Sequence, residues 1–470
     1  MSSVWMQRAM RALVVVSVAM LVACGGGSGG SAPIVTPTPT TPQPPAFVAP
    51  DWFPKGVADS LPQLEITTVN AAPIVSRDDY VKGSYKLSGT GVTAAEGALE
   101  IKGRGNSTWD WPKKPYRLKL GAAAGLLGMP SSKHWVLLAN YADKTLVRND
   151  TAFTFSRSLG LAYTVRDRHV EVTLNGQYLG VYQLTEHVRI APDRVNVPEL
   201  KVGDTAAPAV TGGYFMEVDF RMHKDYCKDP GVLPYSPFCV SGVNTQRNTV
   251  LCLDSTHGMD PACLKEPETL LAPEWAAQRA YLEKYYADFE AALFGPDFKD
   301  SAKGYAAYVD VDSVVDYYLI NELFKNVDGA VASFFIVKQR DGKFSFGPIW
   351  DFDLALGNAG YNDVDKTYGW HIRKATWFAR FFEDPAFAAK VKARWAALKT
   401  AGKFEEIFQY AQARASWLEK MQQKNFTTWP IFNWTTWYTR YVGGSYAAEV
   451  KEMLRWQRER YAWMDGEMSK

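Results

Sequence analysis

The sequence predicts an α+β fold with two lobes, a strand-rich first half and a mainly helical second half. Two patterns indicate this: apolar and polar residues alternate between about 99 and 184, whereas apolar residues recur three and four apart from about 265 onward. A hydrophobic content of 47% with 14% aromatic residues is typical of a well-packed globular protein. A junction between two such lobes is the usual place for a ligand cleft.

Five segments of the first half have the character of strands. The segments LEIKG and YRLKL alternate, HWVLLANY is an apolar run, and HVEVTL and QYLGVYQL flank Asn175-Gly176, a strong hairpin-turn signal. Asp143 is expected to cap a helix that runs to about Ser158 and is closed by Gly160. We therefore expect four or five strands with one intervening helix.

The second half has helical periodicity, clearest at 273–294 and 309–326 and again after residue 353. The expected folded domain spans 51–470. It divides into an N-lobe at about 51–190, a cysteine-containing insertion at about 223–265 and a C-lobe at about 266–470.

The first 23 residues have the pattern of an export signal. Arg8 and Arg11 precede the apolar run LVVVSVAMLVA, which is too short to span a membrane and ends at Cys24. Leu-Val-Ala-Cys resembles a bacterial lipobox, so Cys24 is expected to be lipidated, with ordinary signal cleavage as the alternative. Residues 24–50, rich in Gly, Ser, Pro and Thr, predict a tether. We expect an exported protein that is lipid-anchored to the bacterial cell envelope.

Four further cysteines lie within 37 residues, at Cys227, Cys239, Cys252 and Cys263. An even, clustered set in an exported protein predicts disulfides, and loop-closure entropy favours pairing between neighbours. Zinc is the alternative, but the spacings are long and no Cys-x-x-Cys occurs. The net charge of +2 gives no indication of a nucleic-acid partner.

Three aspartates gather around one predicted hairpin. SFFIVK and FSFGPIW flank Asp341-Gly342, and a turn there places Ser333 opposite Trp350 and Asp328 close to Asp351 and Asp353. Carboxylates held together need a cation, and oxygen ligands favour Mg²⁺, Mn²⁺ or Ca²⁺ over zinc. The alternative is that these acids only cap helices and solvate turns.

The order of these elements resembles the lower lobe of a protein kinase, in which a catalytic Asp precedes a hairpin that delivers a metal-binding Asp. Ser333 stands where the kinase pattern has a metal-binding Asn. In the first half, Arg104, Gly105, Asn106 and Ser107 lie in a turn between two strands, where backbone N–H groups can hold phosphates. Arg117 and Lys119 share one face of the following strand, which suits triphosphate if it faces a cleft.

Five ordered blocks resemble the CotH kinase family, the spore-coat-protein-H-like proteins. They are IKGRGNSTWDWPKKPYRLKL, HWVLLANYADKTLVRND, NGQYLGVYQLTEHV, GGYFMEVD and FGPIWDFDLALGN. The resemblance implies an atypical secreted protein kinase that uses ATP and magnesium, with manganese as an alternative ion, and phosphorylates Ser/Thr of secreted or surface proteins.

The same resemblance implies roles for individual residues. Asp328 is expected to be catalytic, and Asp351 to hold the metal with support from Asp353 and Ser333. Lys119 is expected to reach the phosphates with the Arg104–Ser107 turn beside it, and Glu186 to lie where adenine packs.

Two other classes of function stay open: a kinase-shaped surface binding or adhesion protein with little turnover, and a calcium-stabilised structural lipoprotein. The aromatic segment TTWPIFNWTTWYTRY, 427–441, could stack against a sugar, but packing against the terminal helices is favoured.

Overall fold

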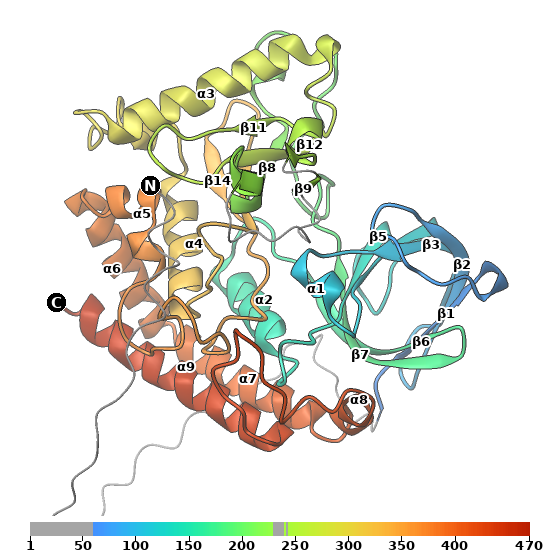
Figure 1. Cartoon of the computed structure of the whole chain (residues 1–470). Coiled ribbons are helices and arrows are strands. Elements are labelled where there is room, and N and C mark those ends of the chain that lie inside the picture. The colour runs from blue at the N-terminus through green and yellow to red at the C-terminus, as the bar shows by residue number, and fades with distance from the viewer. Residues whose placement is uncertain (1–59, 229–238, 241–242) are drawn as a thin grey trace, which may run out of the picture.

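The computed structural model describes residues 60–228, 239–240 and 243–470. The predicted export signal, Cys24, the tether and residues 51–59 of the predicted N-lobe lie outside this part of the chain. Figure 1 shows a β-barrel beside a larger, mainly helical body. The fold is therefore mixed α and β, with strands concentrated in the N-terminal region and helices in the C-terminal region, as the sequence predicted.

The barrel closes in the order β1-β2-β3-β4-β5-β7-β6. Its strands are β1 Gln63–Thr68, β2 Val81–Ser88, β3 Ala95–Gly103, β4 Tyr116–Ala124, β5 Ser132–Leu138, β6 Asp167–Leu174 and β7 Gln177–Glu186. β1 pairs in parallel with β6, and the other neighbours are antiparallel. The prediction of four or five strands was too low because it omitted β1 and β2, which also alternate between buried and exposed residues.

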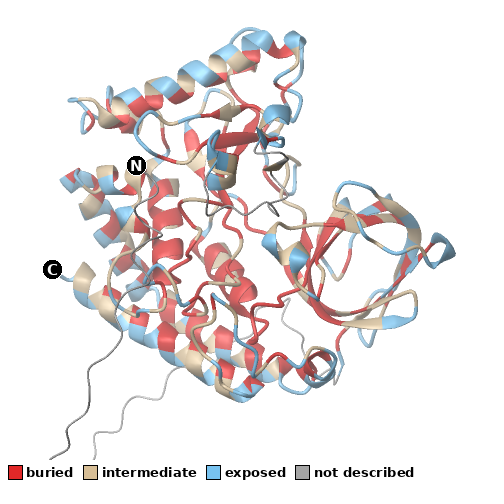
Figure 2. Ribbon diagram, viewed as in Figure 1, coloured by how far each residue is buried: buried red, intermediate tan, exposed pale blue. Residues whose placement is uncertain are grey.

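Alternation along each strand fills the barrel with apolar side chains. Leu64, Leu99, Leu118, Val172 and Leu184 are each almost fully buried, and Figure 2 shows buried residues along the barrel strands. The predicted hairpin turn is confirmed between β6 and β7, since Asn175 and Gly176 both have positive φ, at 51° and 80°. This geometry is typical of the Asn-Gly turn that joins two strands directly.

A second, five-stranded sheet lies in the other body, in the order β11-β12-β8-β13-β14. Its strands are β8 Tyr214–Val218, β11 Cys252–Leu253, β12 Ala262–Glu266, β13 Phe334–Lys338 and β14 Phe344–Phe346; a separate ribbon pairs β9 Cys239–Val240 with β10 Val243–Asn244. Disulfides join Cys227 to Cys239 and Cys252 to Cys263, so the predicted pairing of neighbours is confirmed. Because β12 pairs with β8, the part of the cysteine-containing region that forms β11 and β12 belongs to this sheet.

The helices with the α label are α1 Ser107–Asp110, α2 Arg148–Leu159, α3 Ala276–Phe294, α4 Val311–Leu323, α5 Thr376–Phe381, α6 Pro385–Thr400, α7 Lys403–Leu418, α8 Gln422–Thr428 and α9 Tyr446–Met468. Although α2 follows β5 in sequence, it packs inside the helical body (Figures 1 and 2). In the described part of the chain, none of the helices combines the length and apolar character that a membrane crossing requires.

The predicted start of α2 was wrong by one turn. The Asp143 carboxylate accepts hydrogen bonds from the backbone N–H groups of Thr145 and Arg148, both at 2.9 Å, and it thereby holds a turn that precedes the helix. The predicted end is confirmed, because Gly160 is the left-handed residue that closes α2.

Candidate active site

A cleft of about 1150 Å³ lies between the barrel and the five-stranded sheet. The barrel contributes the turn Arg104–Ser107 and Arg117 from β4. The opposite wall carries Asp328, Ser333, Asp351 and Asp353. The structure thus brings the predicted acidic group and the predicted glycine-containing turn to one cavity, although more than 200 residues separate them in the sequence.

The β13–β14 hairpin lies in the chain between Asp328 and the pair Asp351 and Asp353, and all three acids line the cleft. The Ser333 hydroxyl donates a hydrogen bond to Asp351 Oδ2 at 3.4 Å, and both residues have positive φ, at 52° and 65°. The observed register pairs Ile336 with Phe346, and its extension places Ser333 opposite Ile349. The predicted partner, Trp350, was wrong by one position because five residues connect the strands, so Asp341-Gly342 is not a two-residue turn.

The three carboxylates repel one another. Burial and the negative charge of Asp351 raise the pKa of Asp328 to about 7. Burial raises the pKa of Asp353 well above its ordinary value, and the charges of Asp351, Asp143 and Asp328 add to the effect. Burial also raises the pKa of Asp351, against the opposing effect of the Arg104 and Arg221 cations. A bound cation would relieve this repulsion.

The carboxylates of the cleft could hold a cation whose remaining ligands come from water or a bound molecule. Among the residues that the structure describes, no group of three or more His, Cys, Asp or Glu side chains is placed to hold a metal ion. Magnesium usually binds one or two protein carboxylates and completes its shell with water and substrate phosphates. A magnesium ion held by Asp351 and Asp353 would therefore need further ligands from water or a substrate.

Arg104 is the barrel residue that most directly opposes the acids. Its guanidinium lies 5.6 Å from the ring centroid of Trp350, the residue before Asp351. Burial lowers the pKa of Arg104, while the charges of Asp351 and Glu217 favour its cationic form. A cation held opposite a carboxylate group is suited to bind the phosphates of a metal-bound nucleotide.

A family model described as CotH kinase protein matches residues 101–464. The chain belongs to the CotH kinase family. The match covers both walls of the cleft, from the end of β3 to α9. No curated protein shows significant similarity to the chain.

The expected role of Lys119 in this CotH kinase family member does not agree with its position. The Lys119 ammonium forms an ion pair with Glu100 Oε2 at 2.9 Å, and 45% of the side chain is exposed. Lys119 is not among the residues that line the cleft, whereas Arg117, two residues earlier on the same face of β4, is among them. β4 thus carries Lys119 beyond the lining of the cleft, a position that does not favour the expected contact with phosphates. Arg117 Nε is buried and has no hydrogen-bond partner in the described part of the chain.

Glu186 also faces away from the cleft. Its carboxylate is fully buried, pairs with Arg166 Nη1 at 2.9 Å and accepts a hydrogen bond from the Tyr163 hydroxyl at 3.2 Å. The residues that follow it, His187 and Val188, line the cleft instead. Glu186 itself is thus not part of the cleft lining, and the expectation that it lies near adenine stays a prediction that this position does not favour.

Several cleft residues were not singled out from the sequence. Glu217, Asp219 and Arg221 all line the cleft, and Arg221 donates to both carboxylate oxygens of Asp219, at 2.7 and 2.9 Å. Glu217 forms an ion pair with Lys265 of β12 at 2.8 Å. The i, i+2, i+4 spacing along YFMEVDFR could have placed Glu217, Asp219 and Arg221 on one face of β8 and its extension.

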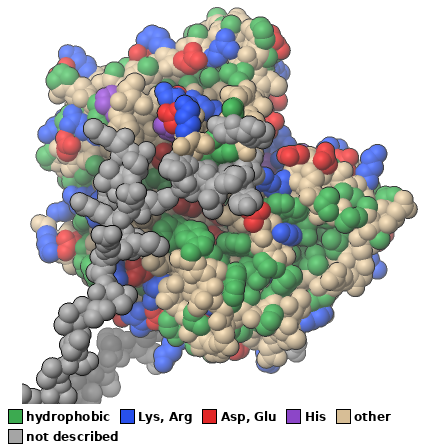
Figure 3. Space-filling model, viewed as in Figure 1, with side chains coloured by type: hydrophobic (Ala, Val, Ile, Leu, Met, Phe, Trp, Pro, Cys, Tyr) green, Lys and Arg blue, Asp and Glu red, His purple; other side chains and the backbone are tan. Residues whose placement is uncertain are grey.

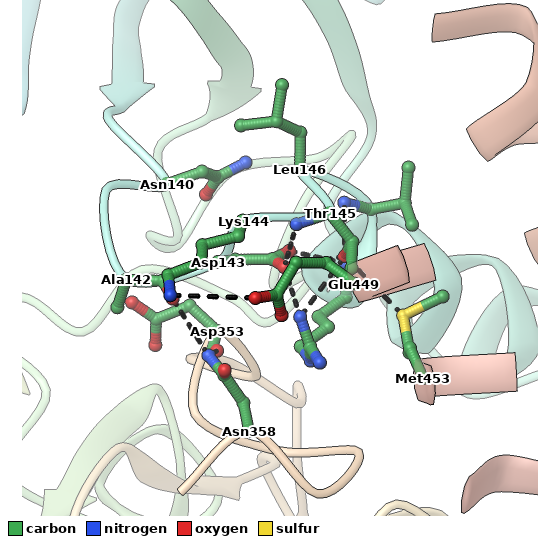
Figure 4. Close-up of polar contacts among 12 residues, drawn as sticks. Asn140, Ala142, Asp143, Lys144, Thr145, Leu146, Asp353, Asn358, Glu449 and Met453 are labelled. Atoms are coloured by element: carbon green, nitrogen blue, oxygen red, sulfur yellow. Dashed lines mark hydrogen bonds and ion pairs between the residues drawn. The ribbon is translucent and has the colours of Figure 1, made fainter. Parts of the chain in front are cut away.

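A polar network supports the loop that carries Asp353 (Figure 4). The Asn358 amide donates to the backbone oxygens of Asp353 and Ala142, at 2.7 and 3.0 Å. Close by, Lys144 forms an ion pair with Glu449 of α9, with 3.5 Å between Nζ and Oε1 (Figure 4). The acidic loop, the turn before α2 and the last helix are thus tied together.

Proposed function

We propose that this protein is a two-lobed, kinase-like phosphotransferase that uses ATP and magnesium to phosphorylate Ser or Thr of exported or surface proteins. The barrel would serve as the N-lobe and the mainly helical body as the C-lobe. The observation that supports this best is the arrangement of the cleft, with Asp328, Asp351 and Asp353 on one wall and Arg104 and Arg117 on the other. This pairing of carboxylates for a metal with cations for phosphate is what phosphoryl transfer requires.

Each residue has a role in the proposed reaction. Asp328 orients the acceptor hydroxyl and accepts its proton, and its burial, which raises its pKa, makes the carboxylate a stronger base than an exposed one. Arg104 and Arg117 bind and orient the phosphates, and Asp351 and Asp353 hold the metal. A bound magnesium ion would neutralise charge on the β- and γ-phosphates.

The proposed location is the outside of the cytoplasmic membrane, with a lipid on Cys24. The pattern of the first 24 residues and the two disulfides support this location, since disulfides persist in oxidising compartments. Metabolic labelling with a radioactive fatty acid, compared between the natural chain and Cys24→Ser, tests the anchor.

A transfer assay tests the activity. The purified protein is incubated with γ-labelled ATP, Mg²⁺ and casein as a general acceptor, in parallel with Asp351→Ala and Asp328→Ala. Labelling should fall at least a hundredfold in both variants. Asp297→Asn, an exposed change outside the cleft, is the matched control. Equal labelling by the natural protein and both variants would contradict the assignment.

Ser333 supports a second candidate, a nucleotide-binding surface protein without turnover. A serine hydroxyl is a poorer metal ligand than the Asn of the kinase pattern, and here it donates to Asp351. Thermal unfolding with ATP and Mg²⁺ separates the two functions. A ligand at 100 times its Kd adds about 2.7 kcal/mol to the free energy of unfolding, so a shift without label transfer favours the binding protein.

A further inference from the structure

One pair of side chains connects the two walls of the cleft. Asn106 lies in the barrel turn between β3 and β4, and Arg221 lies just beyond the end of β8 in the opposite wall. With its amide oxygen toward the guanidinium, Asn106 accepts hydrogen bonds from Arg221 Nη1 at 2.5 Å and from Nη2 at 3.1 Å. We call this pair the cleft bridge. It joins the turn that is expected to bind phosphates to the wall that carries the three aspartates.

Arg221 is fixed within its own wall. Besides the two bonds from its guanidinium to the Asp219 carboxylate, its backbone N–H donates to Asp219 Oδ1 at 3.0 Å. Its backbone oxygen accepts a hydrogen bond from the Asn244 side chain at 2.7 Å, and only 17% of the Arg221 side chain is exposed. A guanidinium that binds a carboxylate through two nitrogens has a defined orientation. The edge of Arg221 that faces Asn106 is therefore held in place by the segment that follows β8.

The turn that carries Asn106 is fixed to the barrel. The Gly105 oxygen accepts a hydrogen bond from Arg77 Nη1 at 2.8 Å. Gly105 has a φ of 87°, and a Cβ atom there would lie 2.1 Å from Thr108 Oγ1, so this backbone conformation requires glycine. Because each partner is fixed to its own wall, the cleft bridge determines how far the turn lies from the opposite wall.

Two other polar contacts between the barrel and the helical body lie outside the cleft. Lys113 Nζ donates to Asn425 Oδ1 of α8 at 3.0 Å, and the Trp429 indole donates to the Leu179 oxygen of β7 at 2.8 Å. None of these four residues lines the cleft. They join the two bodies where β7 meets α8 (Figure 1). The turn is thus tied to the acidic wall by the cleft bridge and not by these contacts.

The cleft bridge also acts on the acids electrostatically. Burial raises the pKa of Asp328 and of Asp351, and the cation of Arg221 opposes the rise in both. The net charge of the chain is only +2, and basic and acidic side chains are interspersed on the face that Figure 3 shows. Phosphate binding in the cleft is therefore expected to depend on where individual cations lie rather than on a general positive field.

We propose that Arg221 is a positioning residue of the transfer reaction. Through Asn106 it holds the phosphate-binding turn at the distance from Asp328 and Asp351 that the reaction requires. The inference rests on the proposed kinase function and adds a residue to it. A displacement of about 1 Å between reacting groups can lower a rate about a hundredfold. Loss of the cleft bridge should therefore lower kcat much more than it raises the KM for ATP.

Steady-state transfer from ATP to casein tests the inference, with kcat and the KM for ATP measured separately. Asn106→Ala removes the acceptor and should lower kcat at least tenfold, while the KM should change less than threefold because Arg104 and Arg117 remain. Asn106→Asp keeps an acceptor for the guanidinium, so kcat should stay within threefold of the natural value; the KM should rise because a carboxylate then lies beside the phosphates. In a protein that already carries Arg221→Ala, Asn106→Ala should cause less than a twofold further loss, because both changes remove the same contact.

Arg247→Ala is the matched control. Arg247 forms an ion pair with Asp254 at 2.7 Å and donates to the oxygen of Met222, the neighbour of Arg221, at 2.6 Å, but it does not line the cleft. This change should lower kcat less than twofold, and thermal unfolding shows that each variant is folded at the assay temperature.

Three results overturn the inference and leave the kinase function standing: a kcat of Asn106→Ala within twofold of the natural value, equal losses in Asn106→Asp and Asn106→Ala, or a tenfold effect of Asn106→Ala in the Arg221→Ala protein. Absence of transfer to casein by the natural protein overturns the two together.

Discussion

The side-chain oxygen of Asn149 accepts a hydrogen bond from the backbone N–H of Phe352 at 2.7 Å. Phe352 lies between Asp351 and Asp353, and Asn149 is the second residue of α2. The Asn149 amide in turn donates to Asn140 at 3.3 Å, next to the end of β5. One buried side chain thus joins the acidic loop to the chain segment that leaves the barrel.

Replacing Asn149 should loosen the acidic loop. Asn149→Ala leaves the buried Phe352 N–H without its acceptor, which costs about 1–3 kcal/mol. We expect the Mg²⁺ concentration needed for half-maximal ATP-dependent thermal stabilisation to rise at least fivefold. Asn140→Ala is the matched control, because it disturbs the same network without touching the loop. Equal shifts in the Mg²⁺ requirement of the two variants would contradict a positioning role.

Removing Arg104 and Lys119 one at a time shows whether the position of a cation in the cleft, and not its charge alone, determines ATP binding. Arg104 lies in the cleft opposite Asp351, whereas the Lys119 ammonium is paired with Glu100 outside it. Arg104→Ala should weaken ATP binding at least tenfold, since hydrogen bonds to charged groups contribute about 1.5–3 kcal/mol each. Lys119→Ala should leave the Kd within twofold. Isothermal titration with ATP and Mg²⁺ measures both, and a larger loss from Lys119→Ala would restore the sequence-based assignment.

Local features of the fold could be predicted from the sequence, whereas the extent of the cleft along β4 could not. Alternation and turn chemistry are local, so β3 to β7, the Asn175-Gly176 turn and the acidic hairpin were all predictable. Alternation also places Arg117 and Lys119 on one face of β4. It does not show where along that face the cleft ends, because β8 and β12, far away in sequence, form the other wall.

The same limit applies to the supporting residues. Asn149 is a polar residue near the start of a helix, and sequence alone favours a capping or solvent-exposed role for it. Its partner is determined by the packing of α2 beneath residues about 200 positions later. The one-residue error in the β13–β14 register has a similar origin, since the loop length depends on how the chain leaves each strand.

The raised pKa of Asp328 predicts a pH dependence of stability in the metal-free protein. The folded pKa of about 7 exceeds the unfolded value near 3.9, so the folded state binds more protons between these values. The free energy of unfolding should therefore fall as pH rises from 4 to 7. Asp328→Asn removes this contribution. The difference in free energy of unfolding between the variant and the natural protein should therefore be roughly 2–4 kcal/mol more favourable to the variant at pH 8 than at pH 4.

Urea unfolding in EDTA at pH 4.5, 6 and 8 measures the difference, with Asp297→Asn as the exposed control. Mg²⁺ with ATP should reduce the advantage of Asp328→Asn at pH 8, because the bound cation stabilises the ionised carboxylates. An Asp328→Asn curve parallel to that of the natural protein at all three pH values would show that the carboxylate is not destabilised by its surroundings.

The two disulfides should differ in their effect on the cleft. Cys252–Cys263 joins β11 to β12, and Cys263, Leu264 and Lys265 line the cleft, whereas Cys227 and Cys239 do not. The bridges close loops of similar length, with sequence separations of 12 and 11, so removal of either should cost about 2–3 kcal/mol of stability. Only the double change Cys252→Ala and Cys263→Ala should also raise the Kd for ATP, at least threefold, because it frees the strand that carries Lys265, the partner of Glu217.

The double change Cys227→Ala and Cys239→Ala is the matched control for the general loss of stability. Denaturant unfolding gives the stability of each variant, and isothermal titration at a temperature where both remain folded gives the Kd. Treatment of the natural protein with a reductant should raise the Kd for ATP as much as the double change Cys252→Ala and Cys263→Ala does. Equal Kd values in the two double variants would mean that the β11–β12 bridge stabilises the fold without shaping the nucleotide site.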